Sequence, residues 1–392
     1  MRNQVIPRYP TYFLLLYAVT YMTNAVYNTF IPVYLNNIGF TQTATGTLLA
    51  LGPLVAVAAH PIWGLVSDRA VTKNKILKIL ILSSAAAVLF YPVSSNFFYL
   101  FAVIAVFTFF QSSINPLSDA ITLEQLESTR WKFGPIRMAG TLGYAAMSVV
   151  AGSILKQDIN RMFILYFCTA MLAFFAVFRL PPVKGHQSGE RKVSILKLFE
   201  NRELVALIIF NFVIQVTLGF YYSFFPIYYK QLGASSALLG WAMFITSISE
   251  IPFLLFADKI IKKLSIQFTL IISALIMALR WFLLHFVTDI HAILAVNATH
   301  GLSFIVFAYC LATFISKNVP KELRSSGQTM NALLCMGLAR ILGSILGGVT
   351  SDALGIKQVF LYTALINFAA ASIFAIIILL HKKKTHDLPL TQ

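Results

Sequence analysis

The feature that most constrains this sequence is a succession of apolar runs, each close to the length that a helix needs to cross a bilayer. A membrane-spanning helix takes about 20 residues. Twelve such runs can be placed along the chain, at residues 11–35, 43–66, 76–93, 97–118, 135–156, 160–179, 202–229, 236–256, 265–286, 289–314, 326–350 and 357–380. They are apolar on every side, as lipid-facing helices are. The sequence therefore predicts an all-α integral membrane protein with twelve transmembrane helices.

The net charge of +16 could suggest a nucleic-acid partner, but the placement of the charge argues against one. Most of the 30 Lys and Arg residues fall in alternate loops and at the two ends of the chain. Basic residues gather on the cytoplasmic side of membrane proteins. We therefore expect no nucleic acid, a lipid bilayer as surroundings, and both termini in the cytoplasm. The expected location is the plasma membrane of a bacterial cell.

An internal repeat divides the chain into two halves. Three positions recur at one constant offset, with Pro32, Gly39 and Gly46 matched by Pro226, Gly233 and Gly240. Duplicated halves are common among secondary transporters. We predict a six-helix bundle at residues 1–180 and a second at 202–392, the latter ending in a basic cytoplasmic tail. The polar stretch 181–201 between them is the predicted cytoplasmic linker.

Catalytic and metal-binding patterns are absent from the sequence. The three cysteines, Cys168, Cys310 and Cys335, lie in apolar runs without C-x-x-C spacing, which favours packing roles. Neither a nucleotide-binding loop nor a Ser-His-Asp spacing stands out. The sequence therefore predicts no enzyme activity, no catalytic residues, no metal and no organic cofactor.

Two charged residues stand inside neighbouring apolar runs. Asp119 directly follows the fourth run and Arg137 lies in the fifth. Charges at membrane depth cost several kcal/mol, so they persist when they are paired or line a wet cavity. We expect Asp119 and Arg137 to form such a pair.

The end of the second run carries a family motif. Gly64 is followed by Asp68-Arg69 and then by Lys73 and Lys75, a pattern that resembles the loop between helices 2 and 3 of the major facilitator superfamily. The resemblance implies the major facilitator fold, with two six-helix halves that alternate access, and a gating role for Gly64, Asp68 and Arg69. The family's glycine after Asp-Arg is missing here.

The fifth run resembles the lactose permease branch of that superfamily. Gly134, Arg137, Gly140 and Gly143-Tyr144 stand in its pattern, and Asp119 lies where that branch has an acid. The resemblance implies that Asp119 and Arg137 bind solute hydroxyls and that Tyr144 stacks on the solute. Carboxylate and guanidinium together offer the acceptors and donors that hydroxyls need. The alternative is a purely structural ion pair.

Paired amides mark two further helices. Asn24 and Asn28 are four residues apart, as are Asn211 and Gln215, so each pair shares a helix face. These faces are either walls of a substrate cavity or helix-packing surfaces. We include all four among the candidate substrate contacts.

A proton-coupling group is expected in the second half. Arg280 and His300 have the spacing of the coupling pair in the permease, but Ser303 replaces its glutamate, and the region looks closer to the nucleoside and phenylpropionate proton symporter branches. Burial favours the protonated form of a carboxyl and a nearby arginine favours the ionised form. Glu250 is therefore the better proton carrier. The alternatives are a static pair of Glu250 with Arg280 or Arg340, and a packing role for His300.

The combined prediction is a monomeric, proton-coupled symporter of a small polar solute, either sugar or nucleoside-like, with the proton as coupling ion. One alternative is a proton-driven exporter of amphipathic drugs or lipids, since 34 phenylalanines and 16 tyrosines could line an apolar cavity. Another is a membrane sensor or scaffold without transport. The sequence leaves the direction of transport open.

Overall fold

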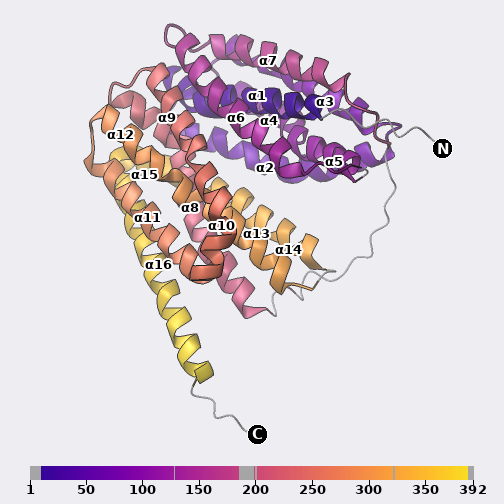
Figure 1. Cartoon of the computed structure of the whole chain (residues 1–392). Helices are drawn as coiled ribbons and strands as arrows, with labels where there is room; N and C mark the ends of the chain where they lie inside the picture. The colour runs from indigo at the N-terminus through magenta and orange to yellow at the C-terminus, as the bar shows by residue number, and fades with distance from the viewer. Residues whose placement is uncertain (1–9, 128, 185–197, 199–200, 321–322, 387–392) are drawn as a thin grey trace, which may run out of the picture. The chain divides into compact units, whose positions relative to one another are not determined.

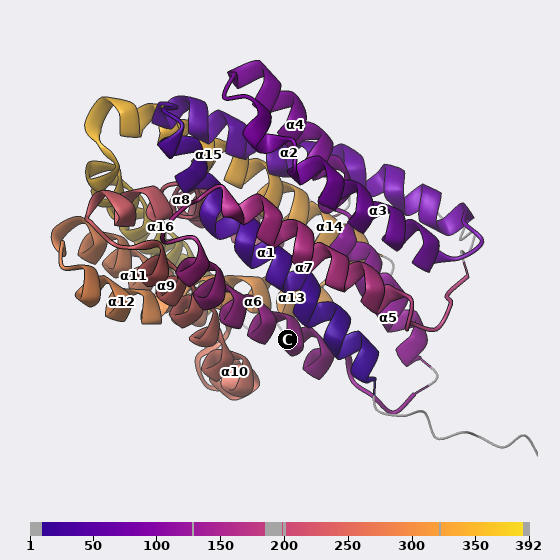
Figure 2. The ribbon, with the colours of Figure 1, turned by 90° about the horizontal axis from the view of Figure 1, so that it is seen from above.

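The computed structural model describes residues 10–127, 129–184, 198, 201–320 and 323–386, and these form helices and loops without a strand. Contacts divide the chain into two compact units (Figures 1 and 2). Unit 1 holds Met1–Arg191 and Tyr229–Ser247, and unit 2 holds Lys192–Tyr228 and Ile248–Gln392.

This division differs from the predicted one, in which the second half begins at residue 202, because residues 229–247 group with unit 1. The reason is close packing between helices: a Cβ on Gly240 would overlap the Ser148 carbonyl, and one on Gly152 would reach Ser236. The predicted halves themselves stay a prediction. Most of the predicted linker 181–201 and the end of the basic tail lie outside the described residues.

Unit 1 is built around its first helix, which runs alongside α6 and α7 (Figure 2). Its helices are α1 (Thr11–Asn37), α2 (Gln42–Arg69), α3 (Lys73–Val88), the 3₁₀ turn η1 (Tyr91–Val93), α4 (Phe97–Gln111), α5 (Ile114–Leu126), α6 (Phe133–Ile154) and α7 (Arg161–Val177), together with most of α9 (Ser236–Ile248).

Unit 2 pairs α11 with the long C-terminal helix α16. Its helices are α8 (Arg202–Gln231), α10 (Glu250–Leu264), α11 (Ile266–Phe286), α12 (Ile290–Asn297), the 3₁₀ segment η3 (Ala298–Leu302), α13 (Phe304–Asn318), α14 (Arg324–Asn331), the π-helical segment η5 (Ala332–Leu338), α15 (Ala339–Leu354) and α16 (Ile356–His386).

The helices match the predicted spans. Within the described residues, 9 helical stretches are long and apolar enough to cross a membrane. The remaining predicted spans correspond to α1, α6 and α7, with 27, 22 and 17 residues. The prediction of an all-α membrane protein with twelve spanning helices is confirmed.

Several spans that the sequence presents as continuous are broken in the structure, and two of the breaks follow from proline. Pro116 has no N–H for the Ser112 carbonyl, which instead accepts from His60 Nε2 at 3.2 Å. Pro252 likewise cannot donate to the carbonyl four residues earlier, and the helix breaks between α9 and α10, at Ser249.

The internal repeat has a conformational counterpart. Gly39 follows α1 with φ +95° and Gly233 follows α8 with φ +91°, which is the left-handed region that glycine adopts without strain. Pro32 and Pro226 lie inside the same two helices. The first helix of each predicted half therefore ends in the same kind of turn.

Candidate functional site

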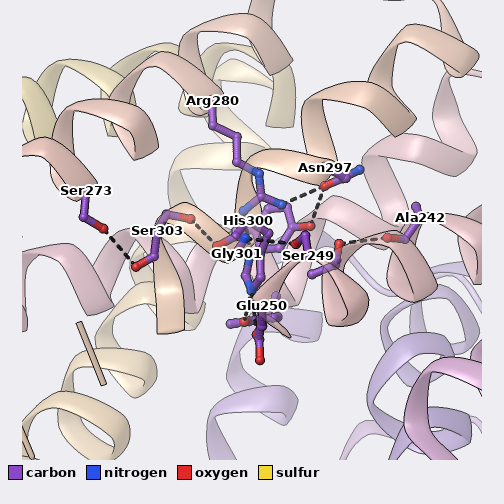
Figure 3. Close-up of polar contacts among 12 residues, drawn as sticks. Ala242, Ser249, Glu250, Ser273, Arg280, Asn297, His300, Gly301 and Ser303 are labelled. Carbon is purple, nitrogen blue, oxygen red and sulfur yellow. Dashed lines mark hydrogen bonds and ion pairs between the residues drawn. The ribbon is translucent and has the colours of Figure 1, made fainter. Parts of the chain in front are cut away.

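Two broken helices meet in unit 2, at Ser249 and Gly301 (Figure 3). The backbone N–H of Gly301 donates to Ser249 Oγ at 2.9 Å. A Cβ on Gly301 would overlap the carbonyl group of Ser249, so only glycine allows this approach. Ser273 Oγ, from α11, donates to the carbonyls of Leu302 and Ser303 at 2.9 and 3.0 Å. The break thus has partners for its backbone groups, as a buried break requires.

A hydrogen-bonded network lies directly beside this crossing. Arg280 Nη1 contacts His300 Nδ1 at 2.7 Å, and Arg280 Nη2 donates to Asn297 Oδ1 at 2.7 Å (Figure 3). Asn297 Oδ1 also accepts from the Tyr221 hydroxyl at 2.8 Å. The Arg280 guanidinium lies 4.3 Å from the centre of the Tyr221 ring, and its side chain is almost fully buried. Arg280 is therefore held in one place.

The contact with Arg280 decides which nitrogen of His300 carries a proton. Guanidinium groups only donate hydrogen bonds, so Nδ1 of His300 must accept and the ring hydrogen sits on Nε2. Nε2 lies 3.1 Å from the Tyr222 hydroxyl and 3.5 Å from Glu250 Oε1. His300 is therefore neutral, with its Nε2–H hydrogen-bonded to the Tyr222 hydroxyl and close to Glu250, while Arg280 holds its other nitrogen.

The Glu250 carboxyl group is the member of this network that can change its protonation state. It is the first residue of α10, and its side chain is 18% exposed. Among the described residues its contact within 4 Å is with the neutral His300 ring, and neither Arg280 nor Arg340 forms an ion pair with it. The structure thus brings together the three residues predicted for proton coupling, with Arg280 bonded to His300 and Asn297 instead of to Glu250.

The predicted pair in unit 1 is also formed. Arg137 Nη1, on α6, lies 3.6 Å from Asp119 Oδ2, on α5, and the two side chains are 46% and 32% exposed. The Tyr17 hydroxyl of α1 donates to Asp119 Oδ1 at 2.5 Å. The Arg137 guanidinium lies 5.2 Å from the Tyr21 ring centre. The pair is held on one side by tyrosines and is accessible on the other.

The other predicted substrate contacts lie in different surroundings. Tyr144 is further along α6, with its hydroxyl 3.3 Å from that of Thr29. Asn24 is buried and accepts from Gln111 Nε2 at 2.8 Å, whereas Asn28 is exposed. The bond between Gln111 and Asn24 joins α4 to α1, as expected if Asn24 has a role in helix packing. A substrate role for these residues stays a prediction.

The amides of α8 are buried inside unit 2. Asn211 Nδ2 donates to Asn331 Oδ1 at 3.1 Å, and Gln215 Nε2 donates to Asn211 Oδ1 at 3.4 Å. Oε1 of Gln215 is buried without a protein partner in the structure. This amide chain joins α8 to α14, just before the π-helical segment. Its observed contacts are those of helix packing.

The predicted gating motif lies at the end of α2. Asp68 is 3.9 Å from Lys73 Nζ, which also donates to Glu124 Oε2 at 2.9 Å. Gly64 has open space where a Cβ would stand, and the Arg69 side chain is exposed. Lys73 therefore connects the loop after α2 with α5. The gating role of the motif stays a prediction.

Some contact residues of both clusters were not predicted from the sequence. Asn297, Tyr221 and Tyr222 complete the network in unit 2, and Tyr17 and Tyr21 complete the pair in unit 1. Their positions along the chain gave the only sequence evidence for these contacts. Asn297 comes one helical turn before His300, and the tyrosines stand in aromatic runs. Such runs are common in membrane helices, so the signal was too weak to use.

Spanning helices that are broken beside buried ionisable groups are typical of membrane transporters. Comparison with known proteins agrees. The model of the MFS_1-like family matches residues 10–362, and the chain belongs to this family of the major facilitator superfamily. The protein is thus a multi-pass membrane transporter, not an enzyme.

Individual relatives cover nearly the same length. The uncharacterized transporter YwbF of Bacillus subtilis (strain 168) is 27% identical over 83% of this chain and 82% of its own. The maltose permease of Geobacillus stearothermophilus is 25% identical over 94% of this chain and 93% of its own. The crystal structure of the nucleoside transporter NupG matches with a TM-score of 0.83 and 18% identity, covering 94% of this chain and 98% of that one. At 18% identity, the match to NupG supports the fold alone.

Proposed function

We propose that the protein couples the movement of protons to the transport of a small hydroxyl-bearing solute across the plasma membrane. The observation that carries the proposal is the contact of Glu250 with a His300 ring whose other nitrogen is occupied by Arg280. Because His300 cannot take a second proton in this arrangement, Glu250 is the group that binds and releases the coupled proton. His300 Nε2 lies 3.5 Å from this carboxyl group, and the Tyr222 hydroxyl is the hydrogen-bond partner of that nitrogen.

The chemistry needs only a change in the surroundings of Glu250. A carboxyl in apolar surroundings keeps its proton, whereas a cation that moves next to it favours release. Arg280 and Arg340 are the intramembrane cations of unit 2 that could play this part when the helices rearrange. The broken helices α9–α10 and α12–α13 provide the places where such a rearrangement can occur, since their backbone is already interrupted.

The Asp119–Arg137 pair is the proposed solute contact in unit 1. The carboxylate accepts and the guanidinium donates, so vicinal hydroxyls of a solute can bind both. Tyr17 fixes the carboxylate and Tyr21 supports the guanidinium. Maltose permease and the nucleoside transporter NupG are similar proteins, and their names favour a sugar or a nucleoside as the solute. We further propose that the protein works as a monomer with both termini in the cytoplasm.

Uptake by reconstituted vesicles tests the proposal. Vesicles containing the protein are given an inward proton gradient in the presence of labelled maltose, glucose, uridine or an aromatic acid. One of these solutes should accumulate above its outside concentration, and a protonophore should abolish the accumulation. Equal uptake with and without the gradient would rule out proton coupling. Solute leaving the vesicles as protons enter would favour the exporter alternative.

Arg137→Lys is expected to lower the apparent affinity for the transported solute by about tenfold or more, because lysine keeps the charge but loses the planar fork of donors. Stability should change little, because Arg137 is 46% exposed and exposed ion pairs contribute only about 0–1 kcal/mol. The concentration dependence of uptake and the melting temperature measure the two effects. Arg161→Lys, at an exposed arginine that begins α7, is the matched control. Unchanged transport by Arg137→Lys would leave the pair a structural role only.

A further inference from the structure

Arg340 is an intramembrane arginine that forms no hydrogen bond or ion pair with Glu250 or His300 in the described part of the chain. It is the second residue of α15, directly after the π-helical segment η5, and such segments often mark functional positions. Its backbone is pressed against α8, since a Cβ on Gly219 would lie 2.8 Å from Arg340 Cα. A Cβ on Gly343 would overlap the Val216 carbonyl of the same helix. The position of Arg340 along unit 2 is therefore fixed by close packing.

The Arg340 guanidinium has aromatic neighbours but lacks a hydrogen-bond acceptor. It lies 5.1 Å from the ring centre of Tyr222 and 5.7 Å from that of Phe304. Its Nε is buried without a partner, and no described residue forms an ion pair with it or accepts a hydrogen bond from it. Arg280, by contrast, uses both terminal nitrogens. The two terminal nitrogens of Arg340, Nη1 and Nη2, are thus left without an acceptor among the described residues and can donate in parallel to a ligand.

The charges of this region do not balance. Arg280 and Arg340 bring two positive charges, His300 is neutral, and Glu250 brings one negative charge when it is ionised. Protonation of Glu250 increases the imbalance. An uncompensated positive charge inside a membrane protein is costly and is retained where an anion or water neutralises it. The geometry therefore calls for a negative charge that the described part of unit 2 does not supply.

We propose that Arg340 binds the carboxylate of the transported solute, which makes the solute an organic acid. This inference rests on the proposed transport function and names the substrate class for it. A planar guanidinium matches a carboxylate through two parallel hydrogen bonds. The rings of Tyr222 and Phe304 offer apolar surface to the carbon skeleton next to that carboxylate. A single arginine between aromatic rings suits a monoanion better than a phosphate ester, whose second charge has no partner here.

Binding of matched acids and neutral analogues to the purified full-length protein tests this inference. The probes are glucuronate with glucose, 3-phenylpropionate with 3-phenylpropanol, and phenyl phosphate, and binding is measured calorimetrically in detergent. The native protein should bind one acid about tenfold or more tighter than its neutral analogue, because hydrogen bonds between charged groups exceed neutral ones by that much. Arg340→Gln should remove this advantage and leave the affinity for the neutral analogue unchanged.

Two further variants serve as controls for Arg340→Gln. Arg340→Lys keeps the positive charge without the fork and should retain part of the preference for the acid. Arg161→Gln, at an exposed arginine of unit 1, should retain all of it. The inference is overturned if no acid binds the native protein more tightly than its analogue, or if phenyl phosphate is preferred. It is also overturned if Arg340→Gln weakens acid and neutral analogue equally, since Arg340 would then be a structural partner of the network.

Failure of the proposed transport function and failure of the carboxylate site give different results. If an acid binds in an Arg340-dependent way but a proton gradient does not drive its uptake, the coupling proposal fails and the carboxylate site stands. If a proton gradient drives uptake of a neutral sugar or nucleoside only, proton coupling stands and the carboxylate site is wrong.

Discussion

Glu250→Gln is expected to abolish the accumulation of solute against its gradient while leaving exchange of solute across the membrane intact. Glutamine has nearly the size of the protonated side chain but cannot release a proton. The variant should therefore carry solute in both directions without coupling. With one proton per solute, a gradient of one pH unit supports about tenfold accumulation by the native protein. The variant should reach only the outside concentration.

Two assays on the same vesicles separate these effects. Accumulation is measured under an inward proton gradient, and exchange is measured by loading vesicles with unlabelled solute and following entry of the labelled one. Glu127→Gln, at an exposed acid that caps the end of α5, is the control and should behave as the native protein does. Normal accumulation by Glu250→Gln would show that another group carries the proton, and His300→Gln would then be the next variant.

Gly301→Ala is expected to have the largest effect on stability. The added Cβ would overlap the Ser249 carbonyl, which is a backbone atom, and Ser273 holds the carbonyls of Leu302 and Ser303 next to Gly301 in place. Overpacking of this kind costs about 1–3 kcal/mol, and the cost is highest where the opposing atom is backbone. The variant should melt at a lower temperature in detergent and lose the crossing of α10 with η3 that positions Glu250 beside His300.

Gly52→Ala is the matched control for this substitution. Gly52 lies inside α2 with nothing within 4 Å of a Cβ at that position. Alanine there should be neutral or stabilise the helix by about 0.5–1 kcal/mol. A Gly301→Ala protein that melts and transports as the native protein does would mean that the contact between Ser249 and Gly301 is not needed.

The spans were predictable because each is a long apolar run, and two of the breaks could have been predicted from Pro116 and Pro252. The 3₁₀ segment η3 could not. It depends on a contact of Gly301 with Ser249, which is remote in sequence. The grouping of residues 229–247 with unit 1 likewise depends on how tightly Gly240 packs.

The coupling residues were predicted as a set, but their connections were not. Spacing placed Glu250, Arg280 and His300 on neighbouring spans, and an acid was expected to attract the arginine. In the structure Arg280 instead bonds to His300 and Asn297. Helix spacing gives the face of a residue but not the rotation of one helix against another, so partners across helices stay undetermined until the packing is known.

The pH of a weakly buffered suspension of vesicles tests the central claim most directly. Symport predicts that addition of the transported solute makes the outside medium alkaline, because protons enter with it, and that Glu250→Gln and Arg137→Lys reduce or abolish this change. Entry of the solute without any change in pH would contradict proton-coupled symport, and acidification of the medium would show that protons move against the solute.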